Sequence, residues 1–177
     1  MIHFIPNILT KDECKYLTEK FDIERKYRSS SDSDYSGTNI SYGFEPSFDF
    51  NVYLNKLKSK VLEYTTNFDD LLNVNTFVRE YVNTSMLKKH LDRKDISVTM
   101  SICLESTINK EWPLCAEIKN NEYCFNTNVG DGILLFDADK ITHWRDPLNC
   151  HEKERVVQFF LHWSPPAYSS KKTKSLI

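Results

Sequence analysis

Hydrophobic side chains recur at helical spacing in two stretches of the chain. In the first stretch, Thr10 stands three residues before Glu13, which is the pattern of a capping box, and apolar residues then follow at intervals of three and four. These features predict a helix over 11–21. The second stretch repeats its apolar positions at intervals of four, three, four and three, and predicts a helix over roughly 49–67 that lays one stripe on a core.

The segment between these two helices has no periodicity of either kind. Residues 29–47 are dense in Ser, Asp, Gly and Asn, so they predict a long loop that is either an active-site lid or a plain surface loop. At the other end of the chain, residues 165–177 carry a small cluster of lysines. We expect a solvated tail there rather than a binding patch.

Beyond the second helix the apolar pattern changes to a period of two, with many β-branched and aromatic residues, which is typical of strands. Strands are predicted over 77–82, 96–104, 113–118, 123–129, 133–136 and 156–163. Because no helical pattern interrupts them, we expect an α+β fold in which two helices buttress an antiparallel double-stranded β-helix, that is, a jelly-roll or cupin-like barrel. With 177 residues and no internal repeat, the chain predicts one domain over 1–177.

The charge of the chain narrows the class of partner. A formal net charge of −2, with acidic and basic residues interspersed, provides no basic field to gather nucleic acid. The chain shows no signal-peptide pattern and no apolar run of membrane-spanning length. We therefore expect a soluble, cytoplasmic protein with no membrane or nucleic-acid partner.

The five cysteines are an odd number and contain no CxxC pair. This argues against a disulfide framework and against a zinc knuckle, so reduced and mostly buried thiols are predicted. Cys150 stands beside His151, but structural zinc needs four convergent ligands, and we assign no metal to this pair.

Three residues carry the candidate chemistry. His90 and Asp92 are two residues apart, so in an extended segment both side chains point to one face. This pair alone is a weak signal, because it often arises by chance. A second imidazole, His143, follows an apolar strand 51 residues further on. Two histidines and one carboxylate are the set that selects Fe(II) and leaves three coordination positions open, so an iron site is predicted.

Two arginines after His143 are candidates to bind the carboxylate of an oxoacid. Arg155 immediately precedes the last predicted strand, and a guanidinium stays charged and pairs bidentately with carboxylate. The alternative interpretation of Arg155 is a surface residue near Glu152 and Glu154. Arg145 is the second candidate for this role. The alternative interpretation of Arg145 is a structural salt bridge to Asp146 or Glu152.

In this order, these features resemble the 2-oxoglutarate and Fe(II)-dependent oxygenase superfamily, particularly its prolyl-4-hydroxylase-like branch. The resemblance covers most of the chain. Residues 5–14 are similar to the first strand and helix of that branch, and Tyr81 precedes His90 by nine residues. Gly130-Asp131-Gly132 before an apolar strand, then a distal histidine and a trailing arginine, also follow its pattern.

The resemblance implies a function and a role for each residue. His90, Asp92 and His143 would bind Fe(II), Arg155 would anchor 2-oxoglutarate, and Tyr81 would line its pocket. The implied reaction uses O₂ and 2-oxoglutarate to hydroxylate a C–H bond of a small molecule, an amino acid or a peptidyl residue, and yields succinate and CO₂. Ascorbate is implied as an optional reductant.

Three positions depart from the pattern of this branch. Thr84 and Leu87 stand where a glycine and a tyrosine are common, and Cys103 stands where the family often has a tyrosine that bonds the co-substrate carboxylate. Co-substrate binding is therefore expected to depend more on Arg155 and Thr99.

Two other functions remain open. A cupin-type metal-binding barrel, an isomerase or a sensor, would use the same ligand set without 2-oxoglutarate. Cupin sites usually draw more histidines from one early motif than the single His90 near Asp92. A non-catalytic partner-binding module would be expected to have a broken ligand set, whereas this set is complete.

Overall fold

Two antiparallel sheets and two helices make up the structure, a computed structural model that describes residues 1–28 and 42–166. In chain order the elements are β1 (Ile2–Ile5), α1 (Lys11–Arg25), β2 (Tyr42–Phe44), α3 (Asn51–Leu62), β3 (Leu72–Tyr81), β4 (Leu87–His90), β5 (Val98–Ser106), β6 (Leu114–Ile118), β7 (Asn121–Phe125), β8 (Gly132–Phe136), β9 (His143–Arg145) and β10 (Val156–Ser164). The larger sheet has the order β1-β8-β5-β10-β3-β2, and the smaller sheet has the order β4-β9-β6-β7.

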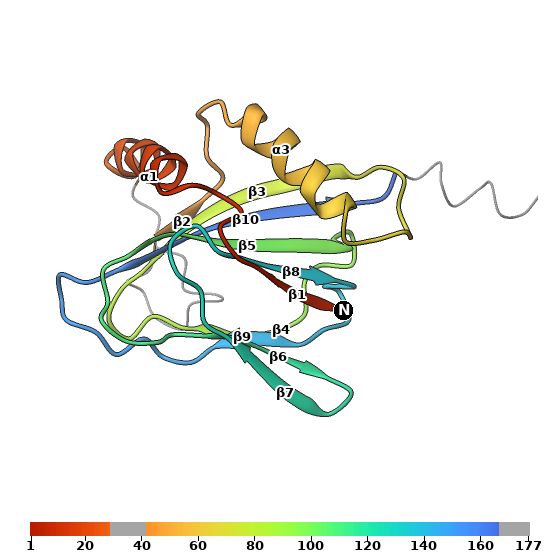
Figure 1. The fold of residues 1–177 in the computed structure, drawn as a ribbon. Coiled ribbons are helices and arrows are strands. Elements are labelled where there is room, and N and C mark those ends of the chain that lie inside the picture. The colour runs from red at the N-terminus through yellow and green to blue at the C-terminus, as the bar shows by residue number, and fades with distance from the viewer. Residues whose placement is uncertain (29–41, 167–177) are drawn as a thin grey trace, which may run out of the picture.

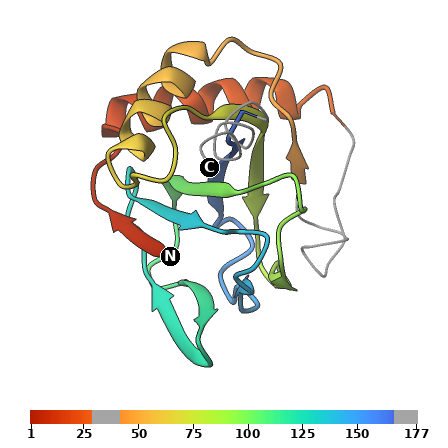
Figure 2. The same cartoon turned by 90° about the vertical axis from the view of Figure 1, so that its right-hand side faces the viewer.

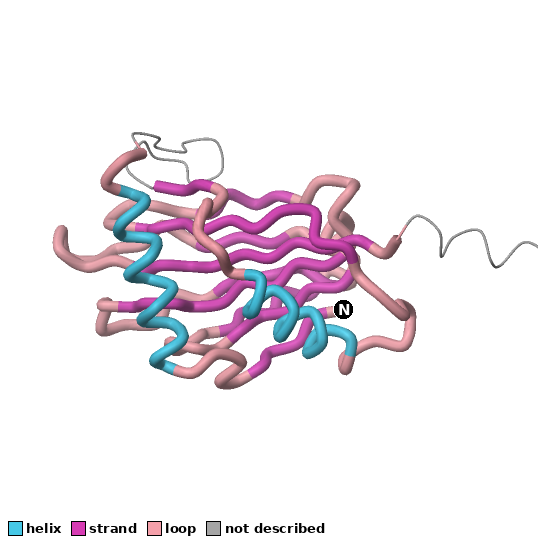
Figure 3. Tube along the Cα trace, turned by 90° about the horizontal axis from the view of Figure 1, so that it is seen from above, coloured by secondary structure: helices cyan, strands magenta, loops and turns pink. Residues whose placement is uncertain are grey.

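The elements are stacked in layers. Figure 1 shows α1 and α3 on the outer face of the larger sheet, with the smaller sheet on the opposite side. Seen from above, both helices cross over the strands of that sheet (Figure 3). Figure 2, turned by 90°, shows the same layers. The arrangement confirms the predicted α+β double-stranded β-helix buttressed by two helices.

Local sequence signals position the first helix. The backbone N–H of Glu13 donates to the Thr10 hydroxyl at 3.2 Å, and the Thr10 N–H donates to the Glu13 carboxylate at 2.8 Å. The predicted capping box is therefore present, and α1 extends four residues beyond the predicted end, to Arg25. The second helix, at 51–62, is shorter than the predicted span of 49–67.

The last strand shows how the period of two divides the interior. Val157, Phe159 and Leu161 belong to the main apolar core, together with the buried residues of α1 and α3. The alternate residues Phe160 and His162 line a cavity on the other face of the sheet. One face of the larger sheet thus holds the helices, and the opposite face is left for the site.

The predicted loop over 29–47 is only partly tested. Residues 42–44 form strand β2, which pairs with β3, so the loop prediction is wrong for these three residues. A strand of three residues is too short to show a period of two. The rest of the predicted lid, 29–41, and the tail residues 167–177 lie outside the described residues.

Cys115 and Cys124 form a disulfide, so the prediction of reduced thiols is wrong for this pair. The hairpin of β6 and β7 places the two cysteines directly opposite each other, and this register cannot be read from a cysteine count. The prediction holds for Cys14 and Cys103, which are buried thiols. Burial raises their pKa values to about 12 and about 11, respectively.

The variant Cys124→Ser is expected to lower the free energy of unfolding by about 2–3 kcal/mol, because the bridge closes a short loop and restricts the unfolded chain. Urea denaturation without reductant measures the change. Cys150→Ser is the matched control, because Cys150 is a thiol, and its effect should stay within about 0.5 kcal/mol. Equal midpoints for oxidised wild type and Cys124→Ser would contradict the prediction.

Among the described residues, neither helix is long and apolar enough to cross a membrane.

Candidate metal centre

Strand pairing brings the three predicted metal ligands together. His90 ends β4, His143 opens β9, and the antiparallel register places them directly opposite each other. Asp92 follows β4 by two residues, and its Oδ1 lies 3.5 Å from His90 Nε2 and 3.7 Å from His143 Nε2. One ligand atom from each residue lies within 4.8 Å of the other two. This spacing allows one metal ion to contact all three.

Backbone carbonyls fix the tautomer of both histidines. His90 Nδ1 lies 2.8 Å from the Lys88 carbonyl oxygen, and His143 Nδ1 lies 2.9 Å from the Ile141 carbonyl oxygen. Because a carbonyl oxygen only accepts, each Nδ1 carries the proton and donates. Each Nε2 therefore presents its lone pair toward Asp92, the arrangement expected of metal-binding histidines.

The environment keeps the ligands in the protonation states that bind metal. Burial raises the pKa of Asp92, but the His90 and His143 imidazoles and the Thr99 hydroxyl outweigh it and lower this pKa to about 2. The Thr99 hydroxyl donates to Asp92 Oδ2 at 2.5 Å. Burial lowers the pKa of His143. The site thus offers a carboxylate and a neutral buried imidazole at neutral pH.

The ligand set lines a cavity of about 190 Å³ between the two sheets. Tyr81 and Thr99, two of the predicted co-substrate residues, lie in its wall together with the three predicted metal ligands. Arg79 and His162 also line it and were not predicted as site residues. The period of two along a strand could have indicated both residues. It places Arg79 on the same face of β3 as Tyr81, and His162 on the same face of β10 as Phe160.

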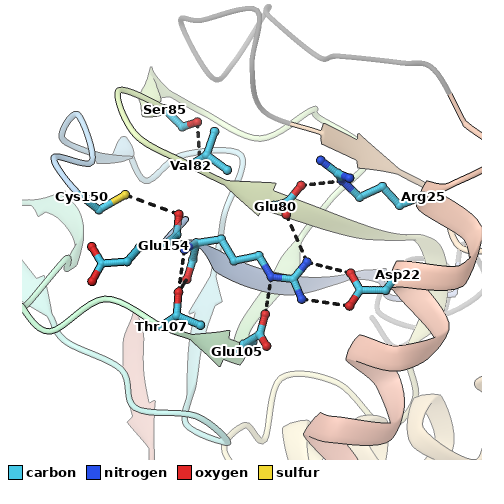
Figure 4. A network of polar contacts seen from close by, with 10 residues as sticks. Asp22, Arg25, Glu80, Val82, Ser85, Glu105, Thr107, Cys150 and Glu154 are labelled. Carbon is cyan, nitrogen blue, oxygen red and sulfur yellow. Dashed lines mark hydrogen bonds and ion pairs between the residues drawn. The ribbon is translucent and has the colours of Figure 1, made fainter. Parts of the chain in front are cut away.

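Arg155 lies elsewhere and does not line this cavity. Its guanidinium pairs with Asp22 at 2.7 and 2.9 Å, with Glu80 at 3.2 Å and with Glu105 at 2.5 Å, in the network of Figure 4. The predicted role as the 2-oxoglutarate anchor is therefore not supported by its position. Arg155 lies on the helix side because residues two apart in an extended segment point to the same face. Val157 packs in the core beneath the helices, so Arg155 also points toward the helices.

Arg145, the rival anchor, lies inside the molecule, but it does not line this cavity either. Only 1% of its surface is exposed, and its Nη1 donates to the Trp112 carbonyl oxygen at 2.7 Å. The guanidinium carbon lies 4.8 Å from the centre of the Trp112 ring. The alternative salt bridge to Asp146 or Glu152 is not formed among the described residues.

Comparison with known proteins identifies the fold. No protein-family model matches the sequence, and no curated protein matches it. Among solved structures, a prolyl-4-hydroxylase from Pseudomonas putida superposes with a TM-score of 0.67 at 14% identity, over 91% of this chain and 91% of that one. An oxidoreductase of the 2OG-Fe(II) oxygenase family from Burkholderia pseudomallei gives 0.72 at 11% identity, over 92% and 85%.

A third neighbour was solved with ligands. HygX from Streptomyces hygroscopicus, with nickel, 2-oxoglutarate and hygromycin B bound, gives a TM-score of 0.66 at 11% identity, over 94% of this chain and 83% of that one. At such identities the likeness shows the fold alone. The chain therefore has the fold shared by prolyl hydroxylases and 2-oxoglutarate/Fe(II) oxygenases, which confirms the resemblance that its sequence predicts.

Proposed function

We propose that the protein is a 2-oxoglutarate- and Fe(II)-dependent dioxygenase, which hydroxylates a C–H bond and produces succinate and CO₂. The observation that carries the proposal is the convergence of His90, Asp92 and His143, with both histidine tautomers fixed for metal binding. The fold supports it, because neighbours with this fold include a protein solved with nickel and 2-oxoglutarate.

The donor set fits the proposed metal. Two imidazoles and one carboxylate converge here, and this is the donor set that would suit Fe(II) and leave positions open for other ligands. His90, Asp92 and His143 would hold the ion, and Thr99 holds the Asp92 carboxylate in place. When bound, iron with 2-oxoglutarate and O₂ supplies an oxidant strong enough to attack an unactivated C–H bond.

The cavity wall would orient the co-substrate and exclude water. Tyr81 is fully buried and Thr99 is 3% exposed, and both line the cavity beside the ligand set. We assign both to the 2-oxoglutarate pocket. Cys103, in the position where the family often has a tyrosine, is buried in a cluster with Tyr81 and Trp112.

The substrate is proposed as a small molecule, an amino acid or a peptidyl residue. The neighbours include a prolyl-4-hydroxylase and a protein solved with hygromycin B, so the fold accommodates substrates of different size. A role for ascorbate as a reductant and a single domain over 1–177 remain predictions. So does the cytoplasmic location, although bridges such as Cys115–Cys124 are rare in the cytosol.

Binding and turnover of 2-oxoglutarate test the proposal. The nickel-loaded protein should bind 2-oxoglutarate, and the metal-free protein should not. With Fe(II) and O₂, succinate should form from 2-oxoglutarate, slowly without substrate and faster with the correct one. A protein that binds the metal but not 2-oxoglutarate would be a cupin-type barrel. A protein that binds neither would overturn the metal site itself.

A further inference from the structure

Two cysteines and two glutamates lie on one face of the β6–β7 hairpin, at the edge of the smaller sheet (Figure 1). Cys115 and Glu117 are two residues apart on β6, and residues two apart on a strand point to the same face. The same holds for Glu122 and Cys124 on β7. The register places the two cysteines opposite each other and the two glutamates opposite each other. All four side chains therefore share one face.

This face points away from the interior of the molecule. Leu114 and Ala116, the neighbours of Cys115 on β6, pack in a buried cluster between the sheets, so Cys115 points to the outer side of the smaller sheet. Glu122 and Cys124 are exposed to solvent. None of the two cysteines and two glutamates lines the cavity of the candidate metal centre. An ion from solution could therefore reach this face without entering that cavity.

Three of the four side chains lie close enough to share one ion. One ligand atom each of Cys115, Glu122 and Cys124 lies within 4.8 Å of the other two. Cys124 Sγ lies 3.4 Å from Glu122 Oε1. Two sulfurs and one carboxylate oxygen are ligands that zinc accepts, and three protein ligands leave the fourth tetrahedral position to water. Soft sulfur ligands favour zinc over hard cations such as Mg²⁺ and Ca²⁺.

The redox state of the cysteines decides whether they can bind a metal. In the disulfide, neither sulfur is a thiolate, and the thiolate is the form that binds metals. A dithiol reductant transfers two electrons and two protons to the bridge, which becomes two thiols, while the reductant becomes a disulfide. Zinc then replaces the two thiol protons. The pairing of β6 with β7 and with β9 should hold Cys115 and Cys124 opposite each other without the bridge.

The glutamates make this face attractive to a cation. Glu117 and Glu122 lie directly opposite each other, and like charges in such a pair repel. Within residues 1–28 and 42–166, neither carboxylate forms a salt bridge. Two thiolates would add further negative charge beside them. A divalent cation would relieve this repulsion.

We propose that the reduced β6–β7 hairpin binds Zn²⁺ through Cys115, Cys124 and Glu122, at a site separate from the candidate metal centre. Disulfide and zinc are then alternative cross-links of the same two strands. The cysteines are nine residues apart and become neighbours only through the hairpin, so the lack of a CxxC pair does not argue against the site. In a reducing compartment, disulfides are rare and paired cysteines more often bind metals or act in catalysis.

Co²⁺ is the probe that tests the site, because a cobalt–thiolate bond has a charge-transfer absorption that nitrogen and oxygen ligands do not produce. The full-length protein is reduced with a dithiol and freed of the reductant without oxygen. A thiol count in denaturant checks the reduction, since three of the five cysteines are free in the bridged protein. Reduced protein should develop the absorption with Co²⁺ and lose it when Zn²⁺ is added. Bridged protein should not develop it.

Four variants assign the ligands. Cys124→Ser should abolish the absorption, whereas Cys150→Ser, which removes a thiol outside the hairpin, should keep it. Glu122→Gln keeps both cysteines and should weaken Co²⁺ binding by at least about tenfold. Glu117→Gln is its matched control, because it makes the same change on the opposite strand, and it should weaken binding by less than about threefold.

The outcomes separate this site from the proposed function. The absorption should survive in His143→Ala, so a failed iron site leaves the test intact. Reduced wild-type protein without the absorption overturns the proposal, and so does a bridge that resists reduction, because the thiolates then never form. An absorption that persists in Cys124→Ser overturns it as well. If Cys124→Ser does not fold, Glu122→Gln decides, and an effect equal to that of Glu117→Gln would contradict the ligand set.

Discussion

His143→Ala is expected to weaken metal binding by more than about 100-fold and to abolish succinate formation. Loss of residues that only support a metal ligand costs 10- to 100-fold, so loss of a ligand itself should cost at least as much. His143 is 4% exposed, and its Nε2 lies 3.7 Å from Asp92 Oδ1, so it is a buried member of the group that could hold the ion. Titration of the purified protein with Ni(II) or Mn(II) measures the affinity directly.

The matched control for this variant is His162→Ala. His162 is a histidine in the wall of the same cavity, but it does not belong to the group of residues that can share one ion. Its loss removes an imidazole of the same volume, and metal affinity should stay within about tenfold of wild type. If both variants lose affinity equally, the ligand set is wrong. If neither does, the metal binds elsewhere.

Arg155→Met is expected to lower the free energy of unfolding by about 2 kcal/mol, less than for a fully buried ion pair, because the Arg155 side chain is 23% exposed. The substitution leaves Asp22, Glu80 and Glu105 close together without the cation that neutralises them. Glu80 is only 4% exposed, so water cannot fully replace the guanidinium, although Arg25 still pairs with it at 2.6 Å. Urea denaturation measures the loss.

A second substitution separates charge from packing in this cluster. Adding Glu105→Gln to Arg155→Met removes one of the repelling carboxylates, so the double variant should be more stable than Arg155→Met alone. Stability at or above wild type for the single variant would mean that the network contributes nothing. A loss of 2-oxoglutarate affinity in folded Arg155→Met protein would instead restore Arg155 as the anchor.

The sequence was sufficient to predict the fold class and the three residues that converge in the candidate metal site. The period of two and the helical stripes are local signals, and they predicted two helices and most of the long strands. His90 and Asp92 belong to one short segment, whereas His143 needed a second signal, the apolar strand before it. Short elements such as β2 carry too few residues for any periodicity.

The faces of the strands were harder to predict than the strands themselves. Arg155 and Arg145 are equally plausible anchors in the sequence, because a one-residue change in parity moves a side chain to the other face of a sheet. The three-dimensional structure is needed to distinguish them. It places Arg155 against α1, where it pairs with Asp22, and it places Arg145 in the interior. The same limit applies to Cys115 and Cys124, whose pairing depends on the register of a hairpin.

The bridged hairpin has a consequence for the choice of reductant in any assay of this protein. Strand β6 pairs with β7 through Cys115 and Cys124 and with β9 through Ala116 and His143. A thiol reagent that is added to keep iron ferrous also opens the bridge, one strand away from His143. Ascorbate reduces iron and leaves disulfides intact. The two reagents are thus not interchangeable, because only the thiol also opens the hairpin.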